Sequence, residues 1–587
     1  MLETTLKTEY IPGTNLTNGL ACAPWRFLLP SLQPGNILWL GIPPVATLKV
    51  LTLMNAEVTV ASTDLPQLEK IRAEIERQAI ANVQLLPIGT WATLPVPSQS
   101  VALVIWGGES KPPAAAVLPG LGRILKNSGV ICFTTENWLD RLASRKILRK
   151  LLRMGFGSLQ RFLMLNGTAF QFDDDRMADY FFSNILYGQS FQKRLLNRAG
   201  KLLNRTGLLR HLVPQQVVSV QRSSTNHEMP PAPEYLRAIA EKAGVDLSGL
   251  RCGLSMRGKY NANKTIFFVF DRKETKPKLV VKMTRAPEFN YRLENEYRAL
   301  SLLRAQGFIE AEAFPESAFF GYHANLAILG QKAVHGEPFR KRTQATADCL
   351  IAQRAVNLIV QLGVASADNG AATAAQAGET LTQLFERFAA VYQPTAFERD
   401  FLTAQIETIG YARGHFPLVF QHGDPGTWNL LVSASGKVIM IDWEAGEPHG
   451  MPLWDLFYFM RSYGSWMARQ QGNRDSLRSF AQQFLEPSAL GAHLTETVAQ
   501  YCSLIGLPEH LVAPLFYTCW MHRALKEATR LTPAALQTGH YANLLRLCIA
   551  RRNAPGLASL FAPGGSSRMW TPAGLDLQQM NAESVRA

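Results

Sequence analysis

The chain has no window of about 18 consecutive apolar residues, which argues against a membrane-spanning helix. Its first residues, MLETTLKTEY, also lack the basic and then apolar order of a signal peptide. Only 18% of the 587 residues are charged and 47% are hydrophobic, a composition that excludes a disordered chain. We therefore expect a globular cytoplasmic protein, and the length predicts two or three domains.

Cysteine is scarce and dispersed, and the sequence has no internal repeats. The seven cysteines contain no C-x-x-C pair, which argues against a zinc site and a disulfide framework and favours a reducing compartment. The net charge of +14 is compatible with phosphate-bearing substrates, nucleic acid or an anionic membrane surface, and it does not choose among them.

One stretch, residues 419–444, carries a pattern of polar residues between short apolar runs. Its order is His422-Gly423-Asp424, Asn429, Leu430–Val432, a Ser/Gly turn, Val438–Ile441 and Asp442. Two short strands joined by such a turn predict a β-hairpin that brings Asn429 and Asp442 side by side.

Phosphoryl transfer needs this set of residue types. A carboxylate must orient the attacking hydroxyl or accept its proton, and oxygen ligands must hold Mg²⁺ against the ATP phosphates. Asp424 suits the catalytic role, and Asn429 with Asp442 suits the metal.

The stretch resembles the aminoglycoside phosphotransferase and choline kinase group of small-molecule kinases. That group has a catalytic loop H-G-D-x-x-x-x-N, followed by a metal-binding acid in I-D-W/F-E and by G-x-P-x-x-D-L; this chain has HGDPGTWN, IDWE and GMPLWDL. The resemblance implies a two-lobed, protein-kinase-like fold that uses ATP and Mg²⁺. It also implies that His422 supports the loop structurally.

The resemblance extends toward the N-terminal side, where Asn263-Lys264-Thr265 matches the end of the family's phosphate-covering loop. It implies that Gly258 and Asn263 belong to the nucleotide site through this loop. Lys282 ends a buried-looking strand, where a lysine needs an anionic partner.

The resemblance makes Lys282 the ligand of the α- and β-phosphates and Glu296 its ion-pair partner, with Glu294 as the alternative. It also implies that adenine hydrogen-bonds the backbone near Leu329 and Gln331.

The first third of the chain alternates strand-like and helix-like segments. Strands are expected at 36–40, 57–61, 83–87, 100–106, 129–134 and 217–220, and helices at 46–54, 65–81 and 114–125. This alternation predicts an α/β domain with a doubly wound, Rossmann-like parallel sheet.

Over residues 20–222 the order resembles class I S-adenosylmethionine-dependent methyltransferases, through WRFLLPSLQPGNILWLG and LPGLGRILKNSGVICFTTEN. The family's first loop, D-x-G-x-G-x-G, is replaced by a stretch with one glycine, Gly41, and two prolines, Pro43 and Pro44, which have no N–H to donate. Asp64 is the nearest carboxylate to the expected ribose ligand and lies out of register. We expect a domain with a degenerate S-adenosylmethionine site.

Two segments, 141–153 and 193–210, are basic and amphipathic. They are interpreted either as ordinary helices that cover the sheet or as a peripheral contact with anionic lipid. Nucleic-acid binding is not favoured, because the basic residues are not interleaved with an aromatic platform.

The expected domains are a methyltransferase-like domain at 1–222, a linker at 223–234, a first kinase lobe at 235–335, a helical second lobe at 336–562 and a loose tail at 563–587. The leading hypothesis is phosphorylation of a hydroxyl on a small molecule, such as a sugar, amino alcohol, aminoglycoside-like compound or glycan intermediate. Two alternatives remain: a methyltransferase with a kinase-like regulatory domain, and a non-catalytic nucleotide-binding scaffold.

Overall fold

A computed structural model describes residues 24–562, except positions 30, 34, 53–56, 108–113, 136–137, 166–167, 172–174, 187–190, 214–215, 223–231, 258–261 and 368–370. The predicted tail, most of the predicted linker and Gly258 lie outside the described residues. The described residues form two compact units. One contains residues up to 341 together with 430–445, and the other contains 342–429 and 446–562.

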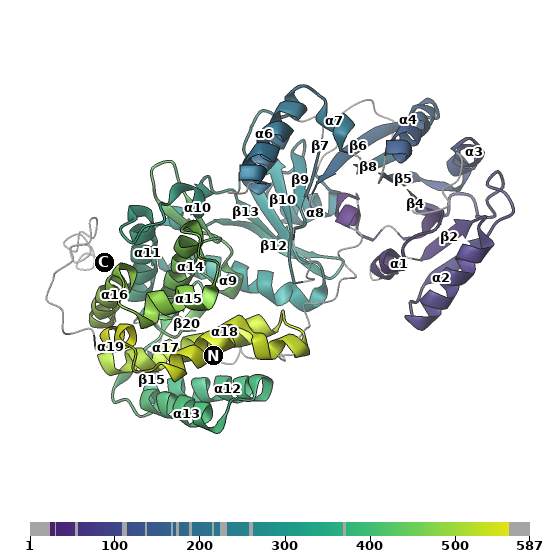
Figure 1. Ribbon diagram of the computed structural model, residues 1–587. Coiled ribbons are helices and arrows are strands. Elements are labelled where there is room, and N and C mark those ends of the chain that lie inside the picture. Colours follow the sequence, from purple (N-terminus) through teal and green to yellow (C-terminus); the bar gives the residue numbers. More distant parts are fainter. Residues whose placement is uncertain are drawn as a thin grey trace. The chain divides into compact units, whose positions relative to one another are not determined.

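The first unit is built on one mixed sheet of 13 strands (Figure 1). Its strands, in spatial order, are β12 (Ser317–His323), β13 (Leu326–Lys332), β11 (Leu279–Met283), β10 (Thr265–Phe270), β9 (Arg251–Ser255), β7 (Thr168–Gln171), β6 (Phe156–Leu165), β8 (Gln216–Arg222), β5 (Leu125–Thr135), β4 (Val101–Trp106), β1 (Ile37–Leu40), β2 (Val58–Ser62) and β3 (Val83–Pro87).

The end of the sheet from β3 to β5 is parallel, as predicted, with the order 3-2-1-4-5 of Rossmann-like sheets. Helices α1 (Val45–Thr52) and α2 (Leu65–Arg77) share a hydrophobic cluster with one face of these strands. Helices α3 (Ala114–Ile124) and α4 (Trp138–Arg153) share a second cluster with the other face. The sheet is therefore doubly wound, and the predicted fold class of this part is confirmed.

From β5 onward every neighbouring pair is antiparallel. The sequence prediction missed β6 and β7, and these strands carry the sheet onward. β7 pairs with β9 through Thr168↔Ser255 and Ala169↔Leu254, so the hydrogen-bonded sheet continues across the expected boundary at 222–235. This pairing differs from the predicted division: the methyltransferase-like part and the first kinase-like lobe form one compact unit.

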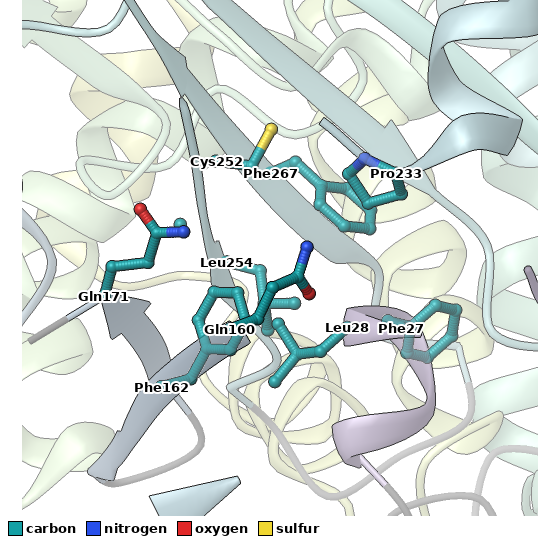
Figure 2. A pocket seen from close by; sticks show the side chains of 10 residues that line it. Phe27, Leu28, Gln160, Phe162, Gln171, Pro233, Cys252, Leu254 and Phe267 are labelled. Carbon is teal, nitrogen blue, oxygen red and sulfur yellow. The ribbon is translucent and has the colours of Figure 1, made fainter. Parts of the chain in front are cut away.

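Side chains from both parts also share one core at this junction. The hydroxyl of Tyr235 in α8 (Glu234–Lys242) donates to the carbonyl of Phe27 at 2.9 Å. Figure 2 shows the small cavity beside this contact, lined among others by Phe27, Gln160, Cys252 and Phe267. Its volume is about 20 Å³, room for one water molecule, so the junction is closely packed.

The remaining elements of this unit flank the sheet or extend the kinase-like lobe. They are α5 (Asp175–Tyr180), a π-helix at Phe181–Ile185, α6 (Phe191–Arg205), α7 (Leu209–Leu212), α9 (Asn290–Gln306), β14 (Glu337–Pro338), β18 (Leu430–Val432) and β19 (Val438–Met440). The predicted hairpin is β18–β19, with Leu430 opposite Met440.

The second unit is mostly helical, as predicted for a second kinase-like lobe. Its helices are α11 (Leu350–Ser366), α12 (Ala374–Tyr392), α13 (Ala396–Gly410), α14 (Trp454–Gln470), α15 (Ser476–Phe480), α16 (Ala489–Ile505), α17 (Val512–Ala528), α18 (His540–Ala550) and α19 (Pro555–Phe561). Its short strands are β15 (Ala371–Thr373), β16 (His415–Pro417), β17 (Val419–Gln421) and β20 (Glu447–Gly450). The stretch 365–378, predicted as a loop, contains β15 and the first turn of α12, which a capping box at Thr373 fixes.

No helix in the part of the chain that the structure describes is long and apolar enough to cross a membrane.

The continuous sheet makes a prediction about Gly253 in β9. A Cβ at this position would lie 2.6 Å from the Phe181 ring and 2.9 Å from Met177 Sδ. We expect Gly253→Ala to lower the free energy of unfolding of the first unit by about 1–3 kcal/mol. Hydrogen exchange should then quicken in β6–β7 and in β9–β10 together. Gly89→Ala is the control, because nothing lies within 4 Å of the added methyl group. Faster exchange confined to β9–β10 would contradict a cooperative sheet.

Candidate active site

Within the first unit, three predicted residues from distant parts of the sequence meet at one ammonium group. Lys282 in β11 is 6% exposed and Glu296 in α9 is fully buried. Lys282 Nζ bonds Glu296 Oε1 and lies 3.3 Å from Asp442 Oδ1. A lysine removed from water needs such carboxylates, so the expectation of an anionic partner for Lys282 is met.

Glu296 and Glu294 lie on different faces of α9, and their hydrogen bonds show which of them is the ion-pair partner of Lys282. Glu296 Oε1 also accepts hydrogen bonds from Gln331 Nε2 at 3.0 Å and from the Trp443 backbone N–H at 3.3 Å. Glu294 instead accepts a hydrogen bond from the exposed Tyr322 hydroxyl. Glu296 is therefore the partner of Lys282.

Asp442 follows β19 with φ of 72°, a left-handed conformation that a non-glycine residue seldom adopts. Its carboxylate collects positive charge from two sides, since Lys264 Nζ bonds the same Oδ1 that Lys282 approaches. Burial works against the ionised form, but the two ammonium groups outweigh it, and the pKa of Asp442 lies well below its ordinary value.

Lys264 was not singled out as a site residue by the sequence, although it lies inside the Asn263-Lys264-Thr265 motif. Its ammonium bonds Asp442 and lies 2.9 Å from Glu444 Oε2, and Arg292 approaches the other oxygen of Glu444 at 3.4 Å. Burial disfavours the charged lysine, but these carboxylates more than compensate and raise the pKa of Lys264 above its ordinary value. Lys264, Arg292, Asp442 and Glu444 thus form a compact, partly buried charged cluster.

The predicted nucleotide residues have different surroundings. Asn263 has a buried Nδ2 with no hydrogen-bond partner among the described residues, which is the condition of a donor that awaits a ligand. Leu329 and Gln331 lie within β13, which is paired on one side with β11 and on the other with β12. Because the sheet occupies both edges of β13 there, these backbones already pair with other strands, and their contact with adenine stays a prediction. Gln331 uses its side chain to hold Glu296.

Within the second unit, the loop after β17 is held by a buried carboxylate. Asp455 in α14 accepts hydrogen bonds from the backbone N–H groups of His422 at 2.6 Å and Gly423 at 3.1 Å. His422 is fully buried, and its Nδ1 accepts a hydrogen bond from the Asp424 N–H at 3.2 Å. These contacts are those of a structural support, the role that the resemblance gives to His422.

The loop brings Asp424 and Asn429 together. Asn429 Nδ2 donates to the Asp424 carbonyl at 2.9 Å and to Asp424 Oδ2 at 3.2 Å, and neither bond uses the Asn429 Oδ1. From Asn429 the chain continues directly into β18.

Two cations of α17 near the loop were missed by sequence reasoning. Arg523 Nη1 lies 3.8 Å from Asp424 Oδ1, and its guanidinium carbon lies 3.3 Å from the centre of the Tyr458 ring. Lys526 Nζ donates to the Gly423 carbonyl at 3.3 Å. Burial, reinforced by Arg523, lowers the pKa of Lys526 to about 8. Two cations three residues apart in a mostly apolar helix were the available signal.

The oxygen donors of Asp442 and Asn429 are of the kind that Mg²⁺ prefers. Among the described residues there is no group of three or more His, Cys, Asp and Glu side chains that could hold a metal ion. Mg²⁺ seldom uses such a group, since it binds one or two carboxylates together with substrate phosphates and water. Taken unit by unit, Asp442 offers a carboxylate that already attracts two cations, and Asn429 offers a carboxamide oxygen that its two bonds to Asp424 do not use.

In the methyltransferase-like part, the two residues singled out near the first loop make contacts within the fold. Asp64, the nearest acid to the expected ribose ligand, instead accepts a hydrogen bond from the Gln67 N–H at 3.2 Å and caps α2. Gly41 has φ of 106° and its N–H donates to the Ala61 carbonyl at 3.0 Å, within the sheet. Both residues therefore serve the fold.

Residues 261–487 match the model of a phosphotransferase enzyme family. The match confirms the resemblance for that segment and supports a small-molecule phosphotransferase. No curated protein shows significant similarity to the chain.

Solved structures resemble each part at low similarity. An aminoglycoside phosphotransferase from Streptomyces rimosus, solved with ADP and streptomycin, covers 46% of this chain and 93% of its own, at 16% identity and a TM-score of 0.29. A methyltransferase dependent on S-adenosylmethionine from Aquifex aeolicus covers 26% of this chain and 88% of its own, at 14% identity and a TM-score of 0.22. Values this low say nothing about the substrates of this chain.

The loop geometry makes a prediction about Asp455. We expect Asp455→Ala to cost about 2–4 kcal/mol of folding free energy, because two buried backbone N–H groups lose their acceptor. Chemical denaturation of the full chain measures this loss. Asp348→Ala is the control, since the Asp348 side chain is 88% exposed. Equal stability of both variants would show that the loop does not depend on Asp455.

Proposed function

We propose that the protein is an ATP- and Mg²⁺-dependent phosphotransferase that phosphorylates a hydroxyl group of a small molecule. The observation that carries the proposal is the meeting of Lys282, Glu296 and Asp442. A lysine–glutamate pair beside a metal-binding aspartate is the arrangement that kinases use to hold the phosphates of ATP. The match of residues 261–487 to a phosphotransferase family supports the same reading.

The proposal gives each residue a role. Lys282, held by Glu296, binds the α- and β-phosphates, and Asn263 with the preceding loop around Gly258 contacts the phosphates. Asp442 and Asn429 would hold Mg²⁺, which neutralises phosphate charge when bound. The direct passage from Asn429 into the β18–β19 hairpin, whose far strand leads to Asp442, supports their joint action.

Asp424 acts on the acceptor. It accepts a hydrogen bond from the attacking hydroxyl, whose oxygen forms a bond to the γ-phosphorus while the bond from that phosphorus to the leaving oxygen of ADP breaks. The proton of the hydroxyl passes to Asp424. The nearby Arg523 favours the ionised carboxylate before the reaction, and Asn429 fixes its orientation.

We propose that the acceptor is a small molecule with a hydroxyl group, such as a sugar, amino alcohol, aminoglycoside-like compound or glycan intermediate. The family match supports this at the level of a small-molecule phosphotransferase. We also propose a cytoplasmic location. The six cysteines that the structure describes are all free thiols, which suits a reducing compartment.

The proposed roles predict that substitution of Asp424 lowers the rate of phosphoryl transfer, whereas substitution of Asp442 lowers the affinity for MgATP. Asp424→Ala should keep MgATP binding within about twofold and lower the rate of phosphoryl transfer at least 10²-fold, because the acceptor loses its base. Asp442→Asn should weaken MgATP binding itself. Calorimetry with MgATP and transfer of labelled phosphate to a panel of hydroxyl compounds separate the two.

Glu294→Gln is the control for these variants, because it removes an exposed carboxylate of the same lobe. Unchanged transfer in Asp424→Ala, or unchanged MgATP binding in Asp442→Asn, would refute the assignment concerned.

The ammonium of Lys264 bonds Asp442, the carboxylate proposed to hold the metal ion. Lys264 and the metal ion should therefore compete for Asp442. Lys264→Met should tighten binding of Mn²⁺ to the nucleotide-free protein by on the order of tenfold, because an ammonium no longer neutralises Asp442. Titration followed by electron paramagnetic resonance of Mn²⁺ measures this without any activity assay. Lys437→Met is the control, since Lys437 belongs to the same unit and its exposed ammonium lies 2.7 Å from Glu310 Oε2. Equal Mn²⁺ affinity of parent and Lys264→Met would exclude competition.

A further inference from the structure

The helix α6 and the segment that follows it carry charge of one sign. Residues 191–212, FQKRLLNRAGKLLNRTGLLRHL, contain six lysines and arginines and no aspartate or glutamate. The same segment contains a set of exposed leucines, each at least half accessible to solvent: Leu195 (58%), Leu196 (68%), Leu202 (64%), Leu208 (50%) and Leu212 (51%).

Helix α6 packs on the protein through Leu203, which lies against a buried hydrophobic cluster, and through polar and small residues of the same face. Asn204 Nδ2 donates to Asp175 Oδ1 at 2.8 Å, and Asn197 Nδ2 donates to the Leu186 carbonyl at 3.1 Å. Gly200 lies between them on the buried face, where a Cβ would come within 2.5 Å of the Phe182 ring. These contacts fix which face of the helix is turned to the solvent.

The outward face combines apolar and basic side chains. Leu195 and Leu202 are seven residues apart and therefore lie on the same side of the helix, with Arg194 and Arg198 beside them and exposed. Arg205 continues this row; it bonds Asp179 at 3.1 Å yet keeps 67% of its side chain accessible.

The other basic helix, α4, provides the contrast. Its apolar residues Ile147, Leu148 and Leu151 are buried in the cluster that covers the sheet. Both helices have an amphipathic and basic sequence, but α4 leaves one leucine exposed, Leu152 at 41%, whereas α6 leaves Leu195, Leu196 and Leu202 more than half accessible. The burial of these side chains supports the interpretation of α4 as a covering helix, and the same support does not extend to Leu195 and Leu202 of α6.

We propose that α6 and the segment to Leu212 form a binding surface for an anionic lipid bilayer. The exposed leucines enter the boundary between headgroups and acyl chains, and the surrounding cations contact the lipid phosphates. Charge favours this occupant over a second copy of the chain, because two such surfaces facing each other would bring twelve like charges together. A partner without negative charge would not form ion pairs with the lysines and arginines of this surface.

Flotation of the full-length protein with vesicles tests the surface. The parent should bind vesicles of equal parts phosphatidylcholine and phosphatidylglycerol, should not bind phosphatidylcholine alone, and should be released by salt. Leu195→Ser with Leu202→Ser should weaken binding about tenfold or more through lost apolar burial. Arg194→Gln with Arg198→Gln should do the same through lost charge.

The matched control is Arg149→Gln with Lys150→Gln, which removes two exposed charges from α4. This control should bind within about twofold of the parent if binding is local to α6. An equal loss of vesicle binding in the α6 variant Arg194→Gln with Arg198→Gln and in this α4 control would mean that binding depends on net charge alone. That result would overturn the proposal.

Binding to neither vesicle, or equal binding to both, would also overturn it. So would a parent dimer that the leucine substitutions convert to a monomer, because the surface would then belong to a second copy. The assay uses no nucleotide, so its result is independent of phosphoryl transfer.

Discussion

The ammonium group of Lys282 has been moved almost entirely out of water, and such a charge is tolerated only where carboxylates surround it. Glu296 and Asp442 supply them from a helix and from the end of a hairpin distant in sequence. Glu296 in turn is held by Gln331 and by the backbone of Trp443. The positions of β11, α9, β13 and the residues after β19 are thus tied to one another by a single desolvated charge.

The second constraint is the shared sheet. Parallel strands covered by helices on both faces pass, through β8, β6 and β7, into the antiparallel strands of the kinase-like lobe. The strands β8, β6 and β7, which join the parallel region to the antiparallel region, are each paired along both edges. Neither part therefore ends in an exposed strand edge at the junction. The cavity there has room for one water molecule, which indicates that the two parts form one packed core.

Residues fixed by short motifs were predictable, and residues fixed by distant packing were not. The spacing around Asp424, Asn429 and Asp442 indicated the loop and hairpin because local turn chemistry determines both. The approach of Arg523 to that loop depends on how α17 packs, which no local pattern encodes. Strands β6 and β7 were missed because their polar and apolar residues do not alternate cleanly, and their place comes from pairing with β8 and β9. The outward turn of α6 was hidden because its hydrophobic pattern matched that of a covering helix.

The pairing of β7 with β9 has a consequence for how such a chain can be divided. A protein cut in the linker and lacking the first part would present the backbone of β9 at Leu254 and Ser255 to solvent along an unprotected edge. Naked strand edges recruit other strands and promote aggregation. The first part therefore shields this strand edge of the kinase-like lobe, a duty that requires no catalysis.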